Sequence, residues 1–193
     1  GKVACLGGTY NLSSPISWTK CHTQLEVIGV LKPTGACALE LGSLTSTTDL
    51  CYIHINRIDG TDKSPDGIRV IGNGGVGIAG ENHIFIGGIE NCDRGIFIPQ
   101  NGRGKGENYF HYNAIRYCNH GVLFQAPFGG FDDYMEGYEF HGGFISTCNY
   151  GIEANGNANY GYVTGVIDCL PAVPHYDFVD NSDLGGWLLA TKW

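Results

Sequence analysis

The sequence predicts an all-β protein: a single right-handed parallel β-helix, in which the chain coils through successive turns of short strands. One phrase, apolar-x-x-Cys-[Asp/Asn]-x-Gly-[Ile/Val]-x-apolar, occurs three times between His83 and Ala154. No segment keeps an apolar period of 3.6 residues, and the chain contains 31 glycines. Self-similarity at a period of 20–50 residues is typical of a repeat architecture, and the missing helical period makes the repeated unit a β unit.

Each copy of the phrase consists of two short apolar runs joined by a turn. The runs are rich in β-branched and aromatic residues and are interrupted by glycine, which predicts strands rather than helices. Stacked copies would place equivalent residues about 4.8 Å apart, as in a solenoid whose core is a column of like side chains. The three copies span residues 84–98, 110–124 and 140–154.

The turn of the repeat predicts its own backbone chemistry. The recurring glycines indicate a position that needs a positive φ, and the Asp or Asn two residues earlier is expected to hydrogen-bond the local backbone. These glycines are Gly95, Gly121 and Gly151, and the polar residues are Asp93, Asn119 and Asn149. The shorter stretch Asp66-Gly67-Ile68 aligns with the same turn with one residue missing.

Eight cysteines could form a disulfide framework in a secreted chain, but several of them recur at one position of the repeat. We therefore expect stacked, buried thiols that behave as small hydrophobic residues. No Cys-x-x-Cys pair occurs, so the sequence predicts no metal site.

One domain covers all 193 residues, with opening turns in 1–50, regular turns in 51–170 and a terminal segment in 171–193. The chain begins in a strand-like run without Met or a signal-peptide pattern, so we expect a fragment of a longer protein. The net charge of −8 weighs against nucleic acid or an anionic membrane as partner. No run of 18 apolar residues predicts a membrane span.

The opening turns carry a resemblance to a known family. They read Gly8-Thr9-Tyr10-Asn11-Leu12-Ser13-Ser14-Pro15-Ile16 and then Val27-Ile28-Gly29. This succession resembles the first turns of the pectate-lyase-like superfamily of right-handed parallel β-helices, as found in bacteriophage tailspikes and tail fibres. The resemblance implies a homotrimer in a virion tail, together with other tail proteins. That superfamily hosts lyases, hydrolases, epimerases and binding modules, so the resemblance does not decide the activity.

The polygalacturonase motifs of that superfamily are not matched. Asp66-Gly67-Ile68 follows Ser64-Pro65 where an Asn-Thr-Asp motif would be needed, and His141-Gly142-Gly143 is not Gly-His-Gly. We therefore do not predict a polygalacturonase.

Segments inserted at one phase of the coil are expected on one face, which is often the binding face of a solenoid. The segment 125–139 combines carboxylates with aromatic rings, as sugar sites do, and two carboxylates at a suitable separation can hydrolyse a glycosidic bond. A solvated loop without a ligand would show the same composition. The candidate catalytic residues are Asp132, Asp133 and Glu136, and the candidate sugar-binding rings are Phe128, Phe131, Tyr134 and Tyr138.

The segment 99–108 is the second candidate, because Arg103 and Lys105 could bind the carboxylate of a uronate or sialate. A glycine-rich surface loop without a ligand is the alternative. No cofactor is predicted, and a Ca²⁺ ion is expected only if the chain is a lyase. His111 and His141 occupy one position of successive copies, where the first copy has Phe85; stacking is expected there, with a metal pair as the alternative.

The sequence thus predicts a phage tailspike or tail-fibre segment that recognises a bacterial surface polysaccharide. A polysaccharide depolymerase, either a glycoside hydrolase or a lyase, is the alternative, and such an enzyme could be secreted. A purely structural virion β-helix is the third possibility. Reduced thiols fit a protein assembled in a cytosol, where disulfides are rare.

Overall fold

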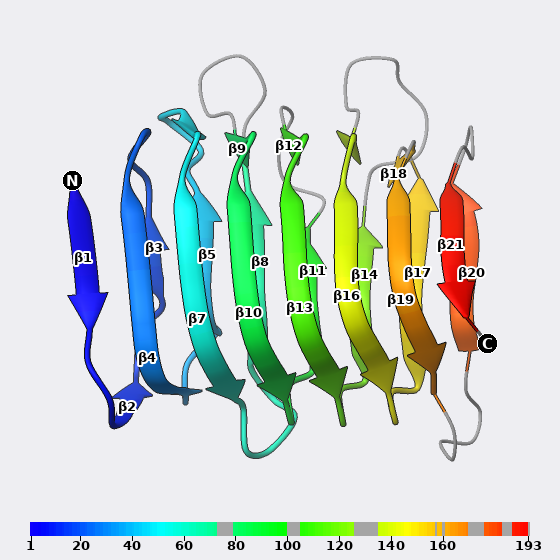
Figure 1. Ribbon diagram of the computed structural model, residues 1–193, viewed down its shortest axis with the longest axis horizontal. Coiled ribbons are helices and arrows are strands. Elements are labelled where there is room, and N and C mark those ends of the chain that lie inside the picture. Colours follow the sequence, from blue (N-terminus) through cyan, green and yellow to red (C-terminus); the bar gives the residue numbers. More distant parts are fainter. Residues whose placement is uncertain are drawn as a thin grey trace.

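A computed structural model describes residues 1–72, 79–99, 105–125, 135–156, 158–159, 161–169, 176–182 and 187–192. Within these ranges the chain forms strands and no helix, and its parallel sheets stack as a solenoid of about six turns (Figure 1). The predicted β-helix is therefore confirmed, while the hand of the coil stays a prediction. Nowhere in the described ranges is there a helix of the length and hydropathy needed to cross a membrane.

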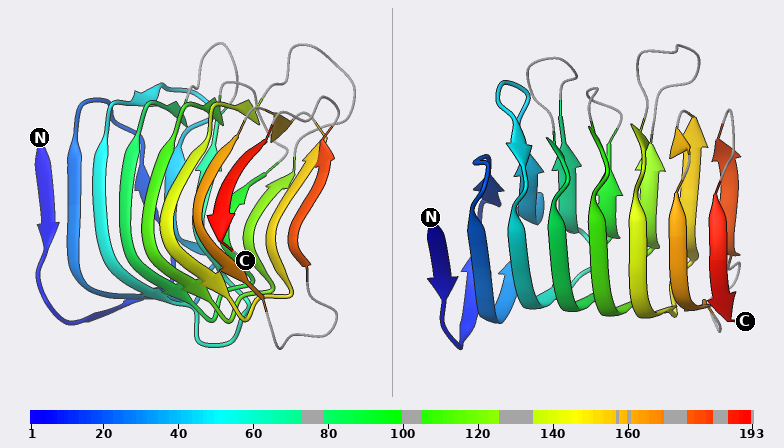
Figure 2. Two further views of the ribbon diagram at one scale, coloured as in Figure 1. Left: turned by 45° about the vertical axis from the view of Figure 1, so that its right-hand side comes forward. Right: turned by 45° about the horizontal axis from the view of Figure 1, so that its top comes forward.

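Each turn of the coil contributes one strand to each of two large parallel sheets (Figure 2). Sheet A contains the longest strands, which bend along their length. In spatial order it consists of β1 (Lys2–Cys5), β4 (Gln24–Pro33), β7 (Tyr52–Asp59), β10 (His83–Glu90), β13 (Tyr109–Arg116), β16 (Glu139–Ser146), β19 (Tyr162–Asp168) and β21 (Leu188–Lys192), with β2 (Thr9–Leu12) paired to β4.

Sheet B lies behind sheet A in the view of Figure 1, and short strands close each turn at one edge. Sheet B consists of β20 (Tyr176–Ser182), β17 (Tyr150–Gly156), β14 (His120–Gln125), β11 (Arg94–Ile98), β8 (Asp66–Ile71), β5 (Cys37–Gly42) and β3 (Ile16–Trp18). The short strands are β6 (Thr48–Asp49), β9 (Ala79–Gly80) and β12 (Lys105–Gly106), which pair with one another, and β15 (Met135–Glu136) with β18 (Ala158–Asn159).

The predicted copies stack in register. Phe85 pairs with His111, which pairs with His141, so equivalent positions of the three copies are neighbours in sheet A. Alternate residues of each strand point into the coil, where like side chains form columns. One such column, fully or almost fully buried, consists of Ile58, Ile89, Ile115, Ile145 and Ile167.

The repeated glycines serve close packing, and the prediction that they adopt a positive φ is wrong. The positive φ belongs to the residue before each cysteine: Asn91 (55°), Tyr117 (58°) and Thr147 (55°). A Cβ atom on Gly121 would lie only 2.5 Å from the carbonyl oxygen of Gly151 in the next turn. Glycine is required because adjacent turns approach too closely for a side chain.

The polar and sulfur columns follow the same stacking. Asn119 donates from Nδ2 to Asp93 Oδ1 at 2.7 Å, and Asn149 Nδ2 lies 3.4 Å from Asn119 Oδ1. The column of polar side chains is thus hydrogen-bonded from turn to turn, whereas the sequence predicted hydrogen bonds to the local backbone.

All eight thiols are free, which confirms the prediction of unpaired cysteines. The recurring ones are buried: Cys92, Cys118, Cys148 and Cys169.

Candidate functional site

Most of the residues predicted from the inserted segments lie outside the described part of the chain, so their roles stay predictions. These are Arg103, Phe128, Phe131, Asp132, Asp133 and Tyr134. The backbones of Lys105 and Glu136 are placed in the short strands β12 and β15, at the edge where each turn closes.

Tyr138 was predicted to bind sugar, but the structure places its ring inside the coil. Its exposed fraction is 1%. The ring packs beside Phe110 and Phe140, nearly parallel to both at centroid separations of 6.4 and 6.3 Å, and meets Phe124 edge-on at 5.1 Å. Burial also raises the pKa of its hydroxyl. Because this ring has no face in solvent, we assign it to the core.

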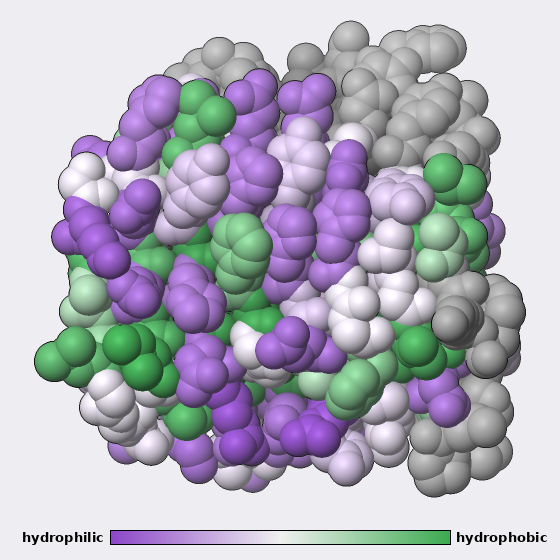
Figure 3. Space-filling model, viewed as in Figure 1, coloured by the Kyte–Doolittle hydropathy of each residue, from purple (hydrophilic) through white to green (hydrophobic). Residues whose placement is uncertain are grey.

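The outer face of sheet A is hollowed across several of its strands. Side chains alternate between the two sides of a strand, so His83 and Phe85 of β10 face outward while Ile84 and Ile86 face the core. Figure 3 shows this face, where hydrophilic and intermediate residues cover most of the middle and hydrophobic residues are interspersed. The outward residues of successive turns therefore form rows across the strands.

Two adjoining hollows on this face make up what we call the groove. The larger, about 680 Å³, runs across β7, β10, β13, β16 and β19. The smaller, about 400 Å³, shares Asn56, Gly87 and Asn113 with the larger and extends to Arg57 and Arg116. The groove therefore crosses the strands and follows the axis of the coil.

A ladder of stacked rings forms one wall of the groove. Phe85, His111 and His141 stack with centroid separations of 4.6 and 5.1 Å. Since neighbouring rings cover one another's faces, the ladder presents ring edges, and Phe85, His111 and His141 all line the larger hollow. A second ladder beside it stacks His83 between Tyr52 and Tyr109, at 5.2 and 4.7 Å.

The imidazoles of the wall differ in their surroundings. Partial burial lowers the pKa of His111, and the neighbouring His141 and His83 lower it further, so the ring is neutral at pH 7. His141 Nε2 lies 2.7 Å from Glu139 Oε2 on the same strand, which gives this imidazole a carboxylate partner at the groove. A neutral imidazole can both donate and accept a hydrogen bond.

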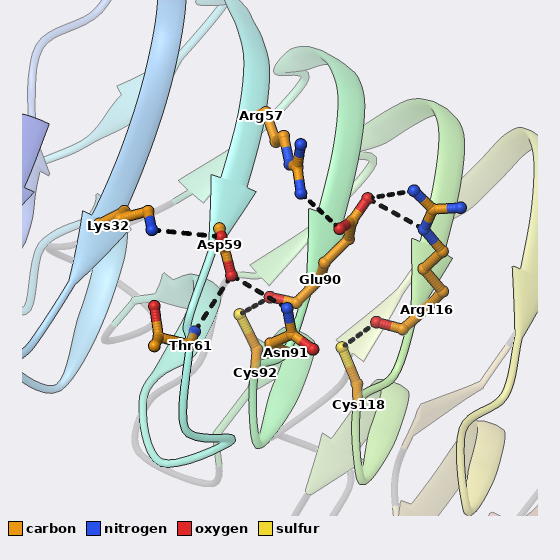
Figure 4. Close-up of polar contacts among 9 residues, drawn as sticks. All are labelled: Lys32, Arg57, Asp59, Thr61, Glu90, Asn91, Cys92, Arg116 and Cys118. Atoms are coloured by element: carbon orange, nitrogen blue, oxygen red, sulfur yellow. Dashed lines mark hydrogen bonds and ion pairs between the residues drawn. The ribbon is translucent and has the colours of Figure 1, made fainter. Parts of the chain in front are cut away.

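A cluster of charges lines the smaller hollow of the groove, and Figure 4 shows the contacts within it. Glu90 accepts from Arg57 Nη2 at 2.7 Å through one carboxylate oxygen. Its other oxygen accepts from Arg116 Nε and Nη2 at 2.9 and 2.6 Å. The side chain of Glu90 is only 9% exposed, whereas those of Arg57 and Arg116 are 45% and 39% exposed. The carboxylate is thus held beneath two guanidinium groups that reach solvent.

Beside this cluster, Asp59 contacts residues of the two adjacent turns. It lies 3.6 Å from Lys32 Nζ and accepts a hydrogen bond from Asn91 Nδ2 at 3.0 Å. These contacts lower the pKa of Asp59 against the opposing effect of burial. The carboxylate is therefore occupied by residues of adjacent turns.

The stacking expected for His111 and His141 is observed, and the alternative of a metal pair receives no support because the two rings stack face to face. Nor does any group of three or more His, Cys, Asp or Glu side chains in the described ranges have the arrangement to hold a metal ion. The arrangement of the groove is suited to hydrogen bonding and charge recognition along an extended ligand.

The residues predicted from the sequence lie in the inserted segments, and the groove was not predicted. The signal was present at His111, His141 and Phe85, which the sequence places in one column, for which stacking was expected with a metal pair as the alternative. Arg57 and Arg116 lie in different rows of the groove; Arg57 lies outside the three copies of the repeat, and Arg116 occupies a variable position of the second copy. Comparison of the chain with protein-family models, curated proteins and solved structures finds no match in any of the three.

Proposed function

We propose that the groove binds an extended polysaccharide of a bacterial surface. The observation that carries this proposal is the direction of the groove, which runs along the coil and repeats similar outward positions from turn to turn. A polymer of repeating sugars is a ligand of matching form, because it can present equivalent groups to successive turns.

The chemistry of the lining supports the same ligand class. Asn56 and Asn113 offer both donors and acceptors, as does the neutral imidazole of His111, while the hydroxyl of Thr164, which donates to the Phe140 carbonyl oxygen, can accept. Sugar hydroxyls need partners of this dual kind. The groove is open along its length, so a long polymer could enter from the side.

The likeness of the opening turns to tailspike β-helices leads us to propose the biological setting. In this setting the chain is a segment of a phage tailspike or tail fibre, located in the virion tail and assembled as a homotrimer with other tail proteins. Its role is host recognition through the bound glycan. The parallel solenoid of the described residues is consistent with this proposal.

The test is an array of capsular and lipopolysaccharide preparations, with neutral and acidic members, probed with the purified chain. A Phe85→Ala/His111→Ala variant should lose about tenfold or more in affinity, since it removes both stacking area and a hydrogen-bonding edge. A Tyr176→Ala variant is the matched control, because this exposed ring lies on sheet B. Absence of binding to every glycan, or equal loss in both variants, would refute the groove as the binding site.

A depolymerase is the second candidate function, and the Glu139–His141 pair favours it because it places a carboxylate-supported imidazole at the groove. Such an imidazole could act as a general base. Mass spectrometry of the glycans after incubation distinguishes the two functions. Defined oligosaccharides that disappear with His141→Gln would establish cleavage at the groove, whereas intact bound polymer indicates binding alone.

A further inference from the structure

We propose that the hollow beside the Arg57–Glu90–Arg116 cluster is a subsite for the carboxylate of an acidic sugar, such as a uronate or a sialate. This proposal rests on the proposed function and specifies its ligand class. Three features carry it: an open floor, two arginines with unused donors, and a net positive charge.

The floor of the subsite is open because two successive turns place small residues in one row. This row runs Arg57, Gly88, Ala114 and Phe144 through β7, β10, β13 and β16. Between the long side chains at its two ends, Gly88 and Ala114 leave the hollow of about 400 Å³. Phe144 is 41% exposed and borders the hollow, where its ring can contact the apolar face of a sugar.

Packing of the coil does not require Gly88 to be glycine. A Cβ atom at this position would meet nothing nearer than 3.9 Å, and its φ is not in the left-handed region. At Gly87, by contrast, a Cβ atom would lie 2.2 Å from the carbonyl oxygen of Asn56. The space above Gly88 is therefore open without a steric need for it, as expected if the space holds a ligand.

Both arginines keep hydrogen-bond donors that Glu90 does not use. Glu90 engages Arg57 through Nη2 alone and Arg116 through Nε and Nη2. A guanidinium group has five N–H donors, and its planar fork matches a carboxylate. The buried Glu90 holds the two groups in place, so a ligand carboxylate would meet donors that are already oriented.

The charges of the cluster leave one positive charge to be neutralised. Two guanidinium groups face one carboxylate, while the whole chain has a formal charge of −8. The other pairs on this face that contain lysine, Lys2–Glu26 and Lys32–Asp59, are balanced. One carboxylate per bound sugar unit would restore neutrality at the cluster.

The experiment measures affinity for polygalacturonate, alginate, hyaluronan and polysialic acid, each beside its carboxyl-reduced, neutral form. The variants are Arg57→Gln, Arg116→Gln and Gly88→Leu. The leucine variant fills the hollow without removing either arginine or Glu90, so it tests the subsite even if an arginine variant folds poorly. Lys20→Gln is the control, because it removes one positive charge at an exposed residue elsewhere.

We expect one or more acidic polymers to bind about tenfold to a hundredfold more tightly than the reduced form, the range for hydrogen bonds to a charged group. The three variants should lose this preference, and Lys20→Gln should keep it. Failure of every acidic polymer to bind, equal binding of the two forms, or full retention of the preference in Gly88→Leu would overturn the subsite. Binding of neutral glycans that depends on Phe85 would then still support the proposed function, and binding of no glycan would refute both.

Discussion

Gly121 lies so close to Gly151 of the next turn that a Cβ atom on Gly121 would be 2.5 Å from the Gly151 carbonyl oxygen and 2.6 Å from Ile145 Cγ2. The same relationship recurs at Gly95, whose Cβ atom would lie 2.5 Å from the Gly121 carbonyl oxygen. Adjacent turns are therefore joined at this corner by backbone contact, and neither partner can give way as a flexible side chain would.

The first prediction concerns this contact. Gly121→Ala should lower the free energy of unfolding by about 1–3 kcal/mol, because the added methyl group overpacks a rigid site. Gly88→Ala is the control, since its methyl group has room; it should leave stability unchanged or raise it by up to about 1 kcal/mol. Urea unfolding followed by circular dichroism measures both, and equal effects would contradict the steric explanation.

The second prediction concerns the isoleucine column. Ile115→Ala should destabilise the fold by about 2–5 kcal/mol, because it removes a fully buried side chain and leaves a cavity in the stack. Val166→Ala, at a partly exposed position of β19, should cost much less. The difference between the urea midpoints of the two variants tests this prediction. Similar midpoints would contradict it and show that neighbouring side chains move in to fill the cavity.

The third prediction concerns thiol reactivity. Burial raises the pKa of Cys37 and Cys169 to about 12, so at pH 8 these thiols stay protonated as well as shielded. In the native protein we expect Ellman's reagent to react promptly with at most the two partly exposed thiols, Cys5 and Cys21. All eight should react after unfolding. Prompt reaction of more than two, or fewer than eight after unfolding without reductant, would contradict the structure.

The fourth prediction concerns acid stability. The folded state lowers the pKa of His111, chiefly by burial and then through His141 and His83. Below about pH 6.5, the ordinary value, the unfolded chain therefore binds more protons at this residue than the folded chain does. Stability should fall as pH drops below that value, and the contribution of His111 is fully retained above it.

His111→Phe keeps a ring in the ladder and removes this titration. Its melting temperature should fall less between pH 7.5 and pH 5.5 than that of the unmodified protein. His22→Gln, outside the ladders, should retain the full fall. Parallel behaviour of all three proteins would show that His111 does not control acid stability.

The repeated phrase predicted the architecture well because its columns are formed by like residues. Cys92, Cys118 and Cys148 share one position in sequence and one in space. The left-handed position was missed because Asn91, Tyr117 and Thr147 have nothing in common as side chains. The repeated glycines had two physical explanations, a positive φ or a close approach to the backbone of the next turn, and the sequence alone cannot distinguish them.

The groove was harder to predict, since its residues converge only when the register of the strands is known. Arg57 and Arg116 are separated by more than one turn of chain and border the same hollow, which the small residues Gly88 and Ala114 leave open. A row that contains arginine, glycine, alanine and phenylalanine has no periodic signature. The hollow above Gly88 and Ala114 could therefore be recognised only from the structure.

The in-register stacking of β7, β10, β13 and β16 has a consequence for how such a protein can change. Every turn adds one residue to each row of side chains that lines the groove, and the turns contact only their neighbours. Duplication of one complete turn would lengthen the groove by about 4.8 Å and preserve the contacts of the existing rows. The length of the groove and its binding specificity can therefore change independently. The number of turns determines how much polymer is spanned, while substitutions such as those at position 88 alter which chemical groups of the ligand are bound.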